Sequence, residues 1–405
     1  MELIYDILIW IFLALQALLG FYLFIPFLFL CLYTIKGGKK NSERKFRVKN
    51  KKNFDFAAII TAHQDLNLIP ALVDSFSKQS YRNFIVYIIA DDCDVTNLTF
   101  SDPRIRILKP EKTLHAKIRS IQYAVDHFIR PHEALVIFDS DNLIHPGCLE
   151  TLNRYFQYGF RAVQAHTVSK NTDTIIAKLD SMGHTYNTFV ERQAKMSLGF
   201  SSSITGSGVA IETELYRQVM YNKNTLGGFD KKLQADIIRQ VPTLAFAENA
   251  IVFDEKVDDG DTLEKQRTRW IYTYFKYFSV NWSLFLSGLK RMNLNIIFFA
   301  FSALRPPLFI MIGLACFCMG IDFFLNPVFS WIWLGILCLF VFSFIMIVVI
   351  QSRRKGMLKV ILYIPLIVIR QVNALFKMKK ASKSFLKTEH VKLVYIEDLL
   401  KNEDV

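Results

Sequence analysis

The sequence predicts an α/β domain with a parallel sheet, inserted between membrane-spanning helices near the two ends of the chain. Hydrophobic residues make up 52% of the 405 residues while charged residues reach 21%, so a strongly apolar portion must be joined to an ordinary polar portion. The long apolar runs lie toward the two ends. Between them, short apolar runs alternate with helical patterns, which is typical of a parallel sheet covered by helices on both faces.

The first apolar run predicts a retained membrane anchor over residues 1–34. Apart from Asp6 and Gln16 it is almost uninterrupted, and it exceeds the roughly 20 residues that cross a bilayer. It lacks a basic n-region and a small-residue cleavage site, so an anchor is favoured over a cleaved signal peptide.

Residues 35–52 form a basic linker in which nine Lys and Arg side chains are opposed only by Glu43. Such a cluster beside a membrane span stays on the cytoplasmic side. We therefore expect a multi-pass protein of the plasma (inner) membrane, with the amino terminus outside and the central domain cytoplasmic. The net charge of +13 would also suit an RNA-binding arm, but no interleaving of aromatic and basic residues accompanies it, so no nucleic-acid partner is expected.

Two more spans are expected near the carboxyl end, at residues 295–324 and 327–350. The following segment, residues 357–376, is long enough to span but contains Lys359 and Arg370. Burying either charge at the bilayer centre costs roughly 2.5 to 3.5 kcal/mol, so a position in the membrane interface is favoured. The sequence thus predicts three spans and a cytoplasmic carboxyl terminus.

The strands of the central domain are predicted from four short apolar runs, three of which are followed by acidic residues. The runs are 56–61, 83–90, 105–108 and 134–138, and residues 68–80 and 116–128 have helical spacing. Asp65 follows the first run, Asp91 and Asp92 follow the second, and Asp139 and Asp141 follow the last. Because ligands of parallel α/β sheets bind beyond the carboxyl ends of the strands, these acids are expected to form one site.

Asp139 and Asp141 flank a single residue where a buried strand meets solvent. In a turn, both carboxylates can point at one hard cation, and Mg²⁺ or Mn²⁺ bound this way completes its coordination with water and substrate phosphates. The same turn can instead cap the next helix or solvate a loop. The neighbouring acidic strand ends favour the metal interpretation.

Further motifs follow along the chain. Gly206 and Gly208 bracket one residue, and Asp236 follows a Gly-Gly pair; either glycine motif could also be a plain loop. The segment Gln266-Arg267-Thr268-Arg269-Trp270 then opens an aromatic stretch, residues 270–289, which is expected to be one amphipathic helix in the membrane interface.

Taken in order, these motifs resemble those of membrane-embedded family 2 glycosyltransferases, which include the cellulose, hyaluronan and poly-N-acetylglucosamine synthases and ceramide glucosyltransferase. The motifs are Thr61-Ala62-His63-Gln64-Asp65, Asp91-Asp92, Lys117, Asp139-Ser140-Asp141, Gly206-x-Gly208, Asp236 and Gln266-Arg267-Thr268-Arg269-Trp270. The resemblance covers about residues 55–390, including Lys387-Thr388-Glu389-His390. It implies a Rossmann-like GT-A fold and inverting sugar transfer from a nucleotide-diphosphate donor such as a UDP-sugar. Polysaccharide or glycolipid synthesis is the expected setting.

The resemblance also implies roles for single residues. Asp139 and Asp141 would hold the metal, and Asp236 would be the general base. The substrate-binding residues would be Asp65, Asp91, Asp92, Lys117, Gly208, Gln266, Arg269 and Trp270. Among these, Asp91 or Asp92 would contact the nucleobase, Arg269 the diphosphate and Trp270 a saccharide or lipid acceptor, although Lys117 could be an ordinary solvated lysine and Trp270 only an interfacial anchor.

The resemblance departs from the family pattern at one position, where Ala235 stands in place of the Glu that usually precedes the base. The alternative function is therefore a catalytically silent membrane scaffold that binds a nucleotide sugar or a partner synthase. The expected organisation is an anchor at 1–34, a basic linker at 35–52, a catalytic domain at 53–262, an interfacial helix at 263–290, two spanning helices at 295–350, and an interfacial helix with a cytoplasmic tail at 351–405.

Overall fold

Eight strands form one sheet in the computed structural model, which describes residues 2–38, 46–220, 227–352, 356–378 and 391–402. The strands are β1 (Phe56–His63), β2 (Phe84–Asp91), β3 (Ile105–Leu108), β4 (Ala134–Asp139), β5 (Leu143–Ile144), β6 (Ala162–Ser169), β7 (Val209–Glu212) and β8 (Ala245–Asp254). Their order across the sheet is β3-β2-β1-β4-β7-β6-β8-β5. The Lys387–His390 stretch and the centre of the basic linker lie outside the described residues.

The four strands that the sequence predicts are present and parallel. Strand β1 pairs with β2 and β4, and β2 pairs with β3. The expectation of a wholly parallel sheet is wrong for the other half, because β7 runs antiparallel to β4 and β6, and β5 runs antiparallel to β8. An apolar run shows that a strand is buried but carries no information about its direction, which is set by the strands it joins.

Helices cover both faces of the sheet. They are α2 (Ile69–Ser77) and α4 (Cys148–Gln157) on one face, and α3 (Lys117–Asp126), α7 (Thr213–Val219) and α8 (Phe229–Ile237) on the other. Helix α5 (Ile175–Thr188), the π-helical turn η2 (Phe189–Gln193) and α6 (Ala194–Leu198) pack instead against the apolar helices of the other half. Successive side chains of a strand point to opposite faces. Accordingly, Ala58 and Ile60 of β1 pack into the core with α2 and α4, whereas Ala57 and Ile59 pack into the core with α3.

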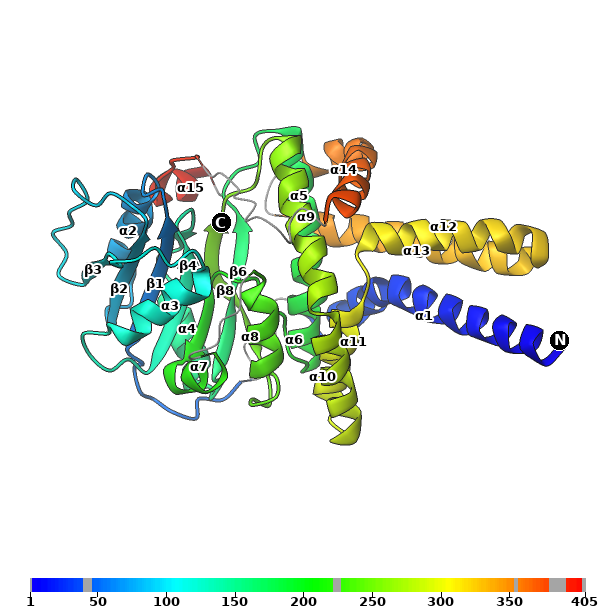
Figure 1. Ribbon diagram of the computed structural model, residues 1–405, viewed down its shortest axis with the longest axis horizontal. Helices are drawn as coiled ribbons and strands as arrows, with labels where there is room; N and C mark the ends of the chain where they lie inside the picture. Colours follow the sequence, from blue (N-terminus) through cyan, green and yellow to red (C-terminus); the bar gives the residue numbers. More distant parts are fainter. Residues whose placement is uncertain (1, 39–45, 221–226, 353–355, 379–390, 403–405) are drawn as a thin grey trace.

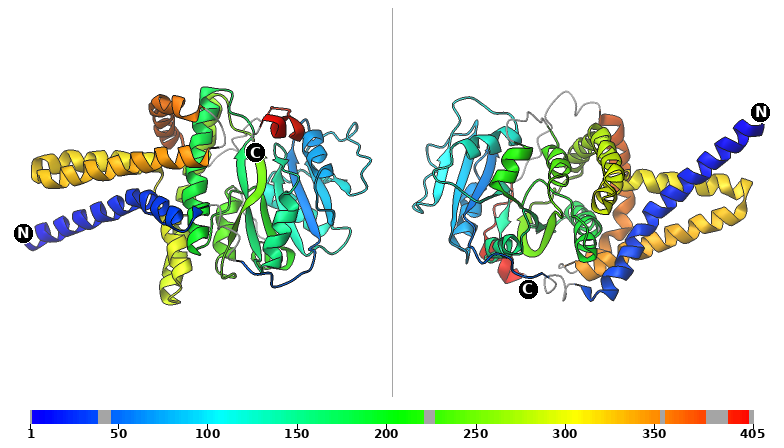
Figure 2. Two further views of the ribbon diagram at one scale, coloured as in Figure 1. Left: turned by 180° about the vertical axis from the view of Figure 1, so that it is seen from behind. Right: turned by 90° about the horizontal axis from the view of Figure 1, so that it is seen from below.

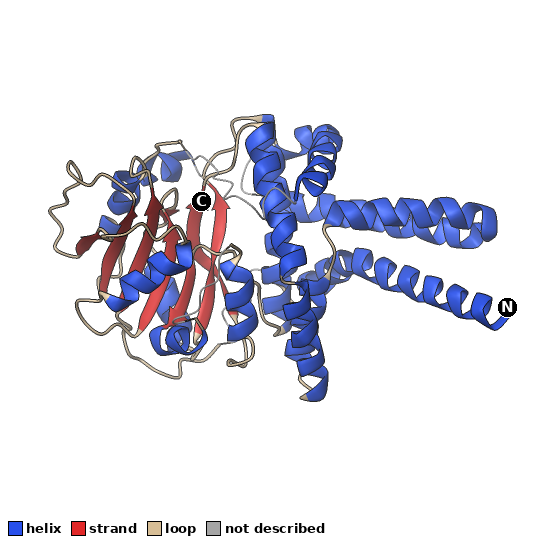
Figure 3. Cartoon of the chain, viewed as in Figure 1, coloured by secondary structure: helices blue, strands red, loops and turns tan. Residues whose placement is uncertain are grey.

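The remaining helices form the other half of the molecule. They are α1 (Glu2–Ile35), α9 (Gly260–Lys276), α10 (Phe278–Lys290), α11 (Leu294–Leu304), α12 (Leu308–Leu325), α13 (Pro327–Gln351), the 3₁₀ helix η3 (Met357–Tyr363), α14 (Ile364–Lys377) and α15 (Ile396–Asn402). Helix α1 and the α12–α13 hairpin project away from the sheet, while α5, α9 and α14 lie across their direction (Figures 1 and 2). The sheet is thus separated from the projecting helices by a helical layer (Figure 3).

Four segments of the described chain are long and apolar enough to cross a membrane: residues 3–35, 308–325, 327–351 and 357–377. The expected span at 295–324 is wrong at its start, because α11 ends at Leu304 and a new helix begins at Leu308. Pro306 and Pro307 cause the break, since proline lacks a backbone donor and holds the preceding residue out of the helical region.

The aromatic stretch after residue 260 is also divided differently from the prediction. The Gln266–Trp270 motif lies in the middle of α9 rather than at the start of a helix, and Tyr277 separates α9 from α10. Asp259 provides the true helix start, because its side chain accepts the backbone N–H groups of Asp261 and Thr262 at 2.9 Å each. This is a standard N-cap arrangement, which stabilises the first turn.

Candidate active site

The carboxyl ends of β1, β2 and β4 meet at one edge of the sheet. The parallel register pairs His63 with Asp91 and Thr61 with Asp139, so the strands leave the sheet at nearly the same level. The structure therefore brings the acidic ends of β2 and β4 to one edge, as the sequence predicts.

Lys117, the first residue of α3, links Asp139 to the loop of residues 206–208, called here the glycine loop. Its ammonium group forms an ion pair with the Asp139 carboxylate and donates to the carbonyl oxygen of Gly206 at 2.8 Å. The same Nζ atom lies 5.3 Å from the ring centroid of Phe229, at the start of α8. Its side chain is only 23% exposed, so Lys117 is held between β4, the Gly206 loop and α8 and is not an ordinary solvated lysine.

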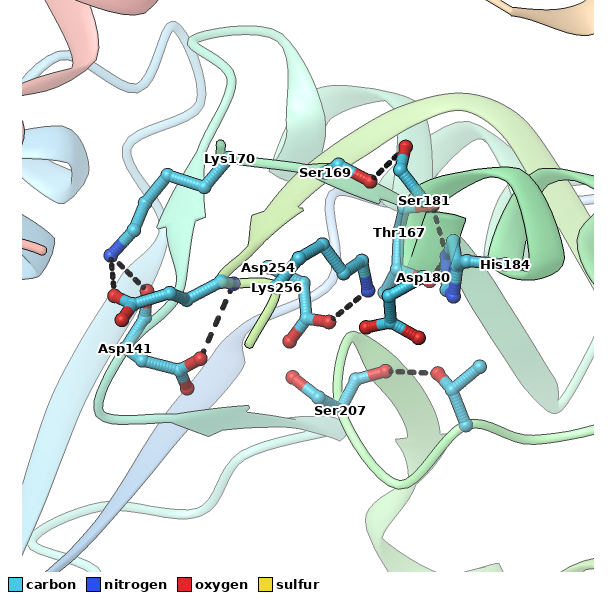
Figure 4. A network of polar contacts seen from close by, with 12 residues as sticks. Asp141, Thr167, Ser169, Lys170, Asp180, Ser181, His184, Ser207, Asp254 and Lys256 are labelled. Carbon is cyan, nitrogen blue, oxygen red and sulfur yellow. Dashed lines mark hydrogen bonds and ion pairs between the residues drawn. The ribbon is translucent and has the colours of Figure 1, made fainter. Parts of the chain in front are cut away.

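Asn142 holds the Asp139–Asn142 turn in place. Its Oδ1 accepts the backbone N–H of Asp139 at 3.0 Å and also accepts the hydroxyl of Ser207. Its Nδ2 donates to Asp254 at 3.4 Å. Figure 4 shows Ser207 and Asp254 beside this turn. The turn is thus fastened to β8 and to the glycine loop by a residue that the sequence analysis did not single out.

The two carboxylates of the turn have different surroundings. Asp139 pairs with Lys117, whereas Asp141 is only 6% exposed and accepts the backbone N–H of Glu255 at 3.4 Å. No cluster of three or more His, Cys, Asp or Glu side chains that could hold a metal occurs in the described part of the chain. Two carboxylates suit Mg²⁺ or Mn²⁺, because these ions take their remaining ligands from water and phosphate.

Asp91 organises the loop that precedes α3. Its carboxylate accepts the backbone N–H groups of Leu114 at 2.7 Å and His115 at 3.1 Å, and lies 2.9 Å from Nδ1 of His63. With 1% exposure, this carboxylate is enclosed by protein donors. The geometry gives Asp91 a structural role at the rim of the site.

Asp92 is exposed and adopts a positive φ of 57°. Its carboxylate accepts the side-chain amide of Gln64, which also has a positive φ of 61°. Such backbone conformations are costly for residues other than glycine and cluster at functional sites. Asp65 instead stabilises its own turn by accepting the backbone N–H of Asn67 at 2.9 Å. Of the three acids after β1 and β2, Asp92 is the most accessible.

Asp236, the expected general base, lies on α8 with a side chain that is only 12% exposed. Its two carboxylate oxygens pair with Lys232 and Arg239. In a helix, a residue six positions after Asp230 points to a different side, so Asp230 and Asp236 have different surroundings.

Asp230 lies at the start of α8 and faces the glycine loop. A Cβ placed on Gly206 would be 3.5 Å from Asp230 Cβ and 3.9 Å from its Cγ. The Asp230 side chain is 21% exposed. The sequence analysis gave this residue no role, although the Gly227-Gly228 pair, separated from it only by Phe229, was the available signal.

Arg269 points from α9 toward the same group of acids. Burial lowers the pKa of its guanidinium, while the charges of Asp139 and Asp230 oppose that shift. The positively charged form of Arg269 is therefore favoured by the acids of β4 and α8. A cation from α9 is thus placed beside the two carboxylates.

The other residues of the α9 motif are placed as follows. Arg267 forms an ion pair with Asp180 of α5, and its Cζ lies 4.2 Å from the ring centroid of Trp270. Trp270 is 47% exposed, so one face of its ring is covered by Arg267 while much of the indole stays accessible. Oε1 of Gln266 is buried and has no hydrogen-bond partner among the described residues.

Gly208 has a packing role. Its φ is +63°, and an added Cβ would lie 3.3 Å from both Ala165 Cβ and Val252 Cγ2. Its backbone N–H donates to Ile137 at 2.8 Å and its carbonyl accepts from Ala165 at 2.7 Å. Both a positive φ and close packing require glycine here.

Comparisons with known proteins agree with this architecture. A family model described as "Glycosyltransferase like family 2" matches residues 53–273, which is more than half of the chain. Among solved structures, the chain is similar to the mannosyltransferase PcManGT from Pyrobaculum calidifontis in complex with GDP-Man and Mn²⁺, with a TM-score of 0.55 and 14% identity over 91% of this chain and 100% of that one. It also matches S. aureus TarS 1-349 in complex with UDP, with a TM-score of 0.35 and 12% identity over 54% of this chain and 64% of that one.

No curated protein sequence matches the chain. At 14% identity, the likeness to PcManGT shows the fold alone. The mixed sheet, the acidic strand ends and the family match nevertheless lead to one assignment. The chain belongs to the family 2 glycosyltransferases and is a glycosyltransferase with a GT-A fold.

Proposed function

We propose that this enzyme transfers a sugar, with inversion, from a nucleotide-diphosphate donor to a saccharide or lipid acceptor at the cytoplasmic membrane face. The observation that carries the proposal is the meeting of Asp139, Lys117, Asp230 and Arg269 at one edge of the sheet. Two carboxylates and two cations from four separate elements match the needs of a donor whose leaving group is a diphosphate.

Asp139 and Asp141 would hold a divalent cation, Mg²⁺ or Mn²⁺, together with the donor diphosphate. When bound, such an ion neutralises the charge that develops on the leaving diphosphate. Lys117 and Arg269 are placed to add fixed positive charge beside it. Charge-assisted hydrogen bonds from guanidinium and ammonium groups to phosphate are among the stronger ones in proteins.

Asp230 is proposed as the general base in place of Asp236. An inverting transfer needs one carboxylate that removes the proton of the acceptor hydroxyl. Asp230 is partly exposed and faces the Gly206 loop, where Lys117 also donates. The replacement of the usual Glu by Ala235 loses significance in this arrangement, because the base is then a different residue.

The acceptor is proposed to approach along the exposed side of α9. Trp270 offers part of an indole face, and a sugar ring packs well on a flat apolar surface. Phe275, Phe278 and Trp282 are also exposed on α9 and α10. These aromatic side chains would place the helices in the headgroup region, where lipid-linked and membrane-bound acceptors are found.

The test is a release assay on the purified full chain, with native membranes as acceptor source. A panel of GDP- and UDP-sugars is supplied with Mg²⁺ or Mn²⁺, and free nucleotide is measured. We expect turnover with one donor, its loss in chelator, and its abolition in Asp141→Asn. Activity that persists in chelator would exclude the metal role, and binding of a donor without release would favour the silent scaffold.

A further inference from the structure

The carboxy-terminal strap, defined as residues 391–402, returns from the helical half and docks on the catalytic domain. Ile396 and Leu399 of α15 are buried in a small cluster with Leu143 of β5 and Phe253 of β8. The strap also forms peripheral ion pairs with Asp173 and Lys78. Exposed pairs of this kind contribute little, so the apolar contact is the main cause of docking.

The backbone of the strap binds a buried carboxylate. The N–H of Val391 donates to Glu255 Oε1 at 2.9 Å, and the N–H of Lys392 lies 3.3 Å and 3.2 Å from the two oxygens of the same carboxylate. Glu255 is buried. A buried carboxylate is costly unless charged partners and hydrogen-bond donors satisfy it, so these two amides are part of what keeps Glu255 in place.

Glu255 in turn contacts the predicted metal-binding turn by two routes. Its own backbone N–H donates to Oδ2 of Asp141 at 3.4 Å. Its carboxylate pairs with the buried ammonium of Lys170 at 2.9 Å, and Lys170 donates to the backbone carbonyl of Asp141 at 3.0 Å. Figure 4 shows Lys170 beside Asp141.

We propose that docking of the strap positions the Asp139–Asn142 turn, with Glu255 and Lys170 as positioning residues. Undocking removes two donors from Glu255, and the Glu255–Lys170 pair then has to rearrange. The two contacts with Asp141 are made by the backbone N–H of Glu255 and by the ammonium group of Lys170. The turn therefore loses its fixed geometry when this pair moves. Partners that orient metal-binding carboxylates commonly change metal affinity 10- to 100-fold when they are removed. The metal consequence depends on the proposed function, whereas the coupling of strap and turn does not.

The test uses two variants of the full chain that release the strap in different ways. Ile396→Asp places a charge in the buried cluster, and its matched control Leu393→Asp adds the same charge at an exposed strap position. Val391→Pro removes one of the two strap amides that bind Glu255, and Val391→Ala keeps that amide. Hydrogen exchange of the peptide containing residues 139–142 is measured without metal or donor, and Mn²⁺ binding in the presence of UDP is measured by EPR.

Both Ile396→Asp and Val391→Pro should speed exchange in the turn and weaken Mn²⁺ binding about tenfold, whereas both controls behave as wild type. In a Glu255→Gln background the strap variants should add a smaller effect than in wild type, because the pairing with Lys170 is already lost while the backbone contact with Asp141 stays. The inference would be overturned if the strap is released while hydrogen exchange in the turn stays unchanged. It would also be overturned if the effects of the strap variants and of Glu255→Gln multiply, or if the control variants behave like the test variants. If wild type binds no Mn²⁺ while the exchange results hold, the proposed metal role fails and the coupling stands.

Discussion

At the scale of single residues, the site is assembled from side chains that neighbour the predicted ones. The acidic turn after β4 was visible in the sequence, but Asn142, which anchors it to Asp254, was not singled out. Likewise, Asp91 proves to be a loop organiser, while Asp92 stays accessible. A motif thus locates a site to within a few residues, and the contacts of each side chain decide its role.

The base assignment leads to a first prediction. Asp230→Asn should lower kcat by 10²-fold or more, in the range expected for a lost general base, with donor affinity largely kept. Asp236→Asn serves as the matched control and should change kcat little, because its carboxylate pairs with Lys232 and Arg239. Steady-state kinetics and donor binding by calorimetry distinguish the two. The opposite order of effects would return the role to Asp236.

Gly208 leads to a second prediction. Gly208→Ala should destabilise the protein by about 1 to 3 kcal/mol, because it combines an unfavourable φ with overpacking against Ala165 and Val252. The KM for the donor should hardly change. Gly183→Ala is the control, since nothing lies within 4 Å of the added Cβ in α5. Thermal unfolding and KM are measured together, and a raised KM without loss of stability would indicate a substrate contact.

At the scale of elements, a buried charge cluster joins the π-helical turn η2 to α11. Glu191 lies 2.6 Å from the ammonium of Lys195, 2.7 Å from the guanidinium of Arg305, and accepts the hydroxyl of Ser302 at 2.9 Å. Burial alone would raise the pKa of Glu191, but the charges of Lys195 and Arg305 lower it to about 2. A buried charge that keeps such a pKa depends on both partners.

This cluster predicts an acid-sensitive contact. Because the folded pKa of Glu191 lies below its unfolded value near 4.5, its stabilisation is present above pH 4.5 and is lost as pH falls toward about 2. At pH 7, Glu191→Gln should cost about 3 to 5 kcal/mol by leaving two cations buried without their counterion. The difference from wild type, measured by thermal unfolding, should narrow below pH 4.5.

Glu212→Gln is the control for that measurement. Its carboxylate pairs with Arg161 at the surface, with both side chains more than one third exposed. An exposed pair contributes about 0 to 1 kcal/mol. An equal loss of stability in the two variants would contradict the special role of the η2 cluster.

At the scale of the whole molecule, α14 decides the topology. It lies along α9, with Arg370 paired to Asp261 and Lys377 paired to Glu264, and across the direction of α12 and α13 (Figure 2). Although residues 357–377 are apolar enough to span, these ion pairs fasten α14 to the helix that carries the Gln266–Trp270 motif. We therefore retain the prediction of three spans, with α14 in the membrane interface.

The topology prediction is tested by cysteine labelling in intact cells, with the six native cysteines removed. A cysteine at Asn402 should stay unlabelled by an impermeant thiol reagent, because three spans leave the carboxyl terminus cytoplasmic. A cysteine at Asn326, in the turn between α12 and α13, should be labelled and serves as the positive control. Labelling at residue 402 would establish a fourth span.

Local sequence patterns were sufficient to predict the four parallel strands, the apolar segments and the family. Continuous apolar runs mark buried strands, and the acids that follow 83–90 and 134–138 reach the same edge because parallel strands align their carboxyl ends. Pro306 and Pro307 also indicated the break between α11 and α12, although the predicted span at 295–324 did not take it into account.

Only the tertiary structure decided the direction of β7, the placement of Asp230 beside the Gly206 loop, and the docking of the strap. Each depends on contacts between segments far apart in the chain: β7 with β4 and β6, Asp230 with the Gly206 loop, and Val391 with Glu255. Sequence periodicity reports which face of an element is buried. It does not report which distant element covers that face, because the free energy of packing two elements together depends on contacts throughout the folded domain.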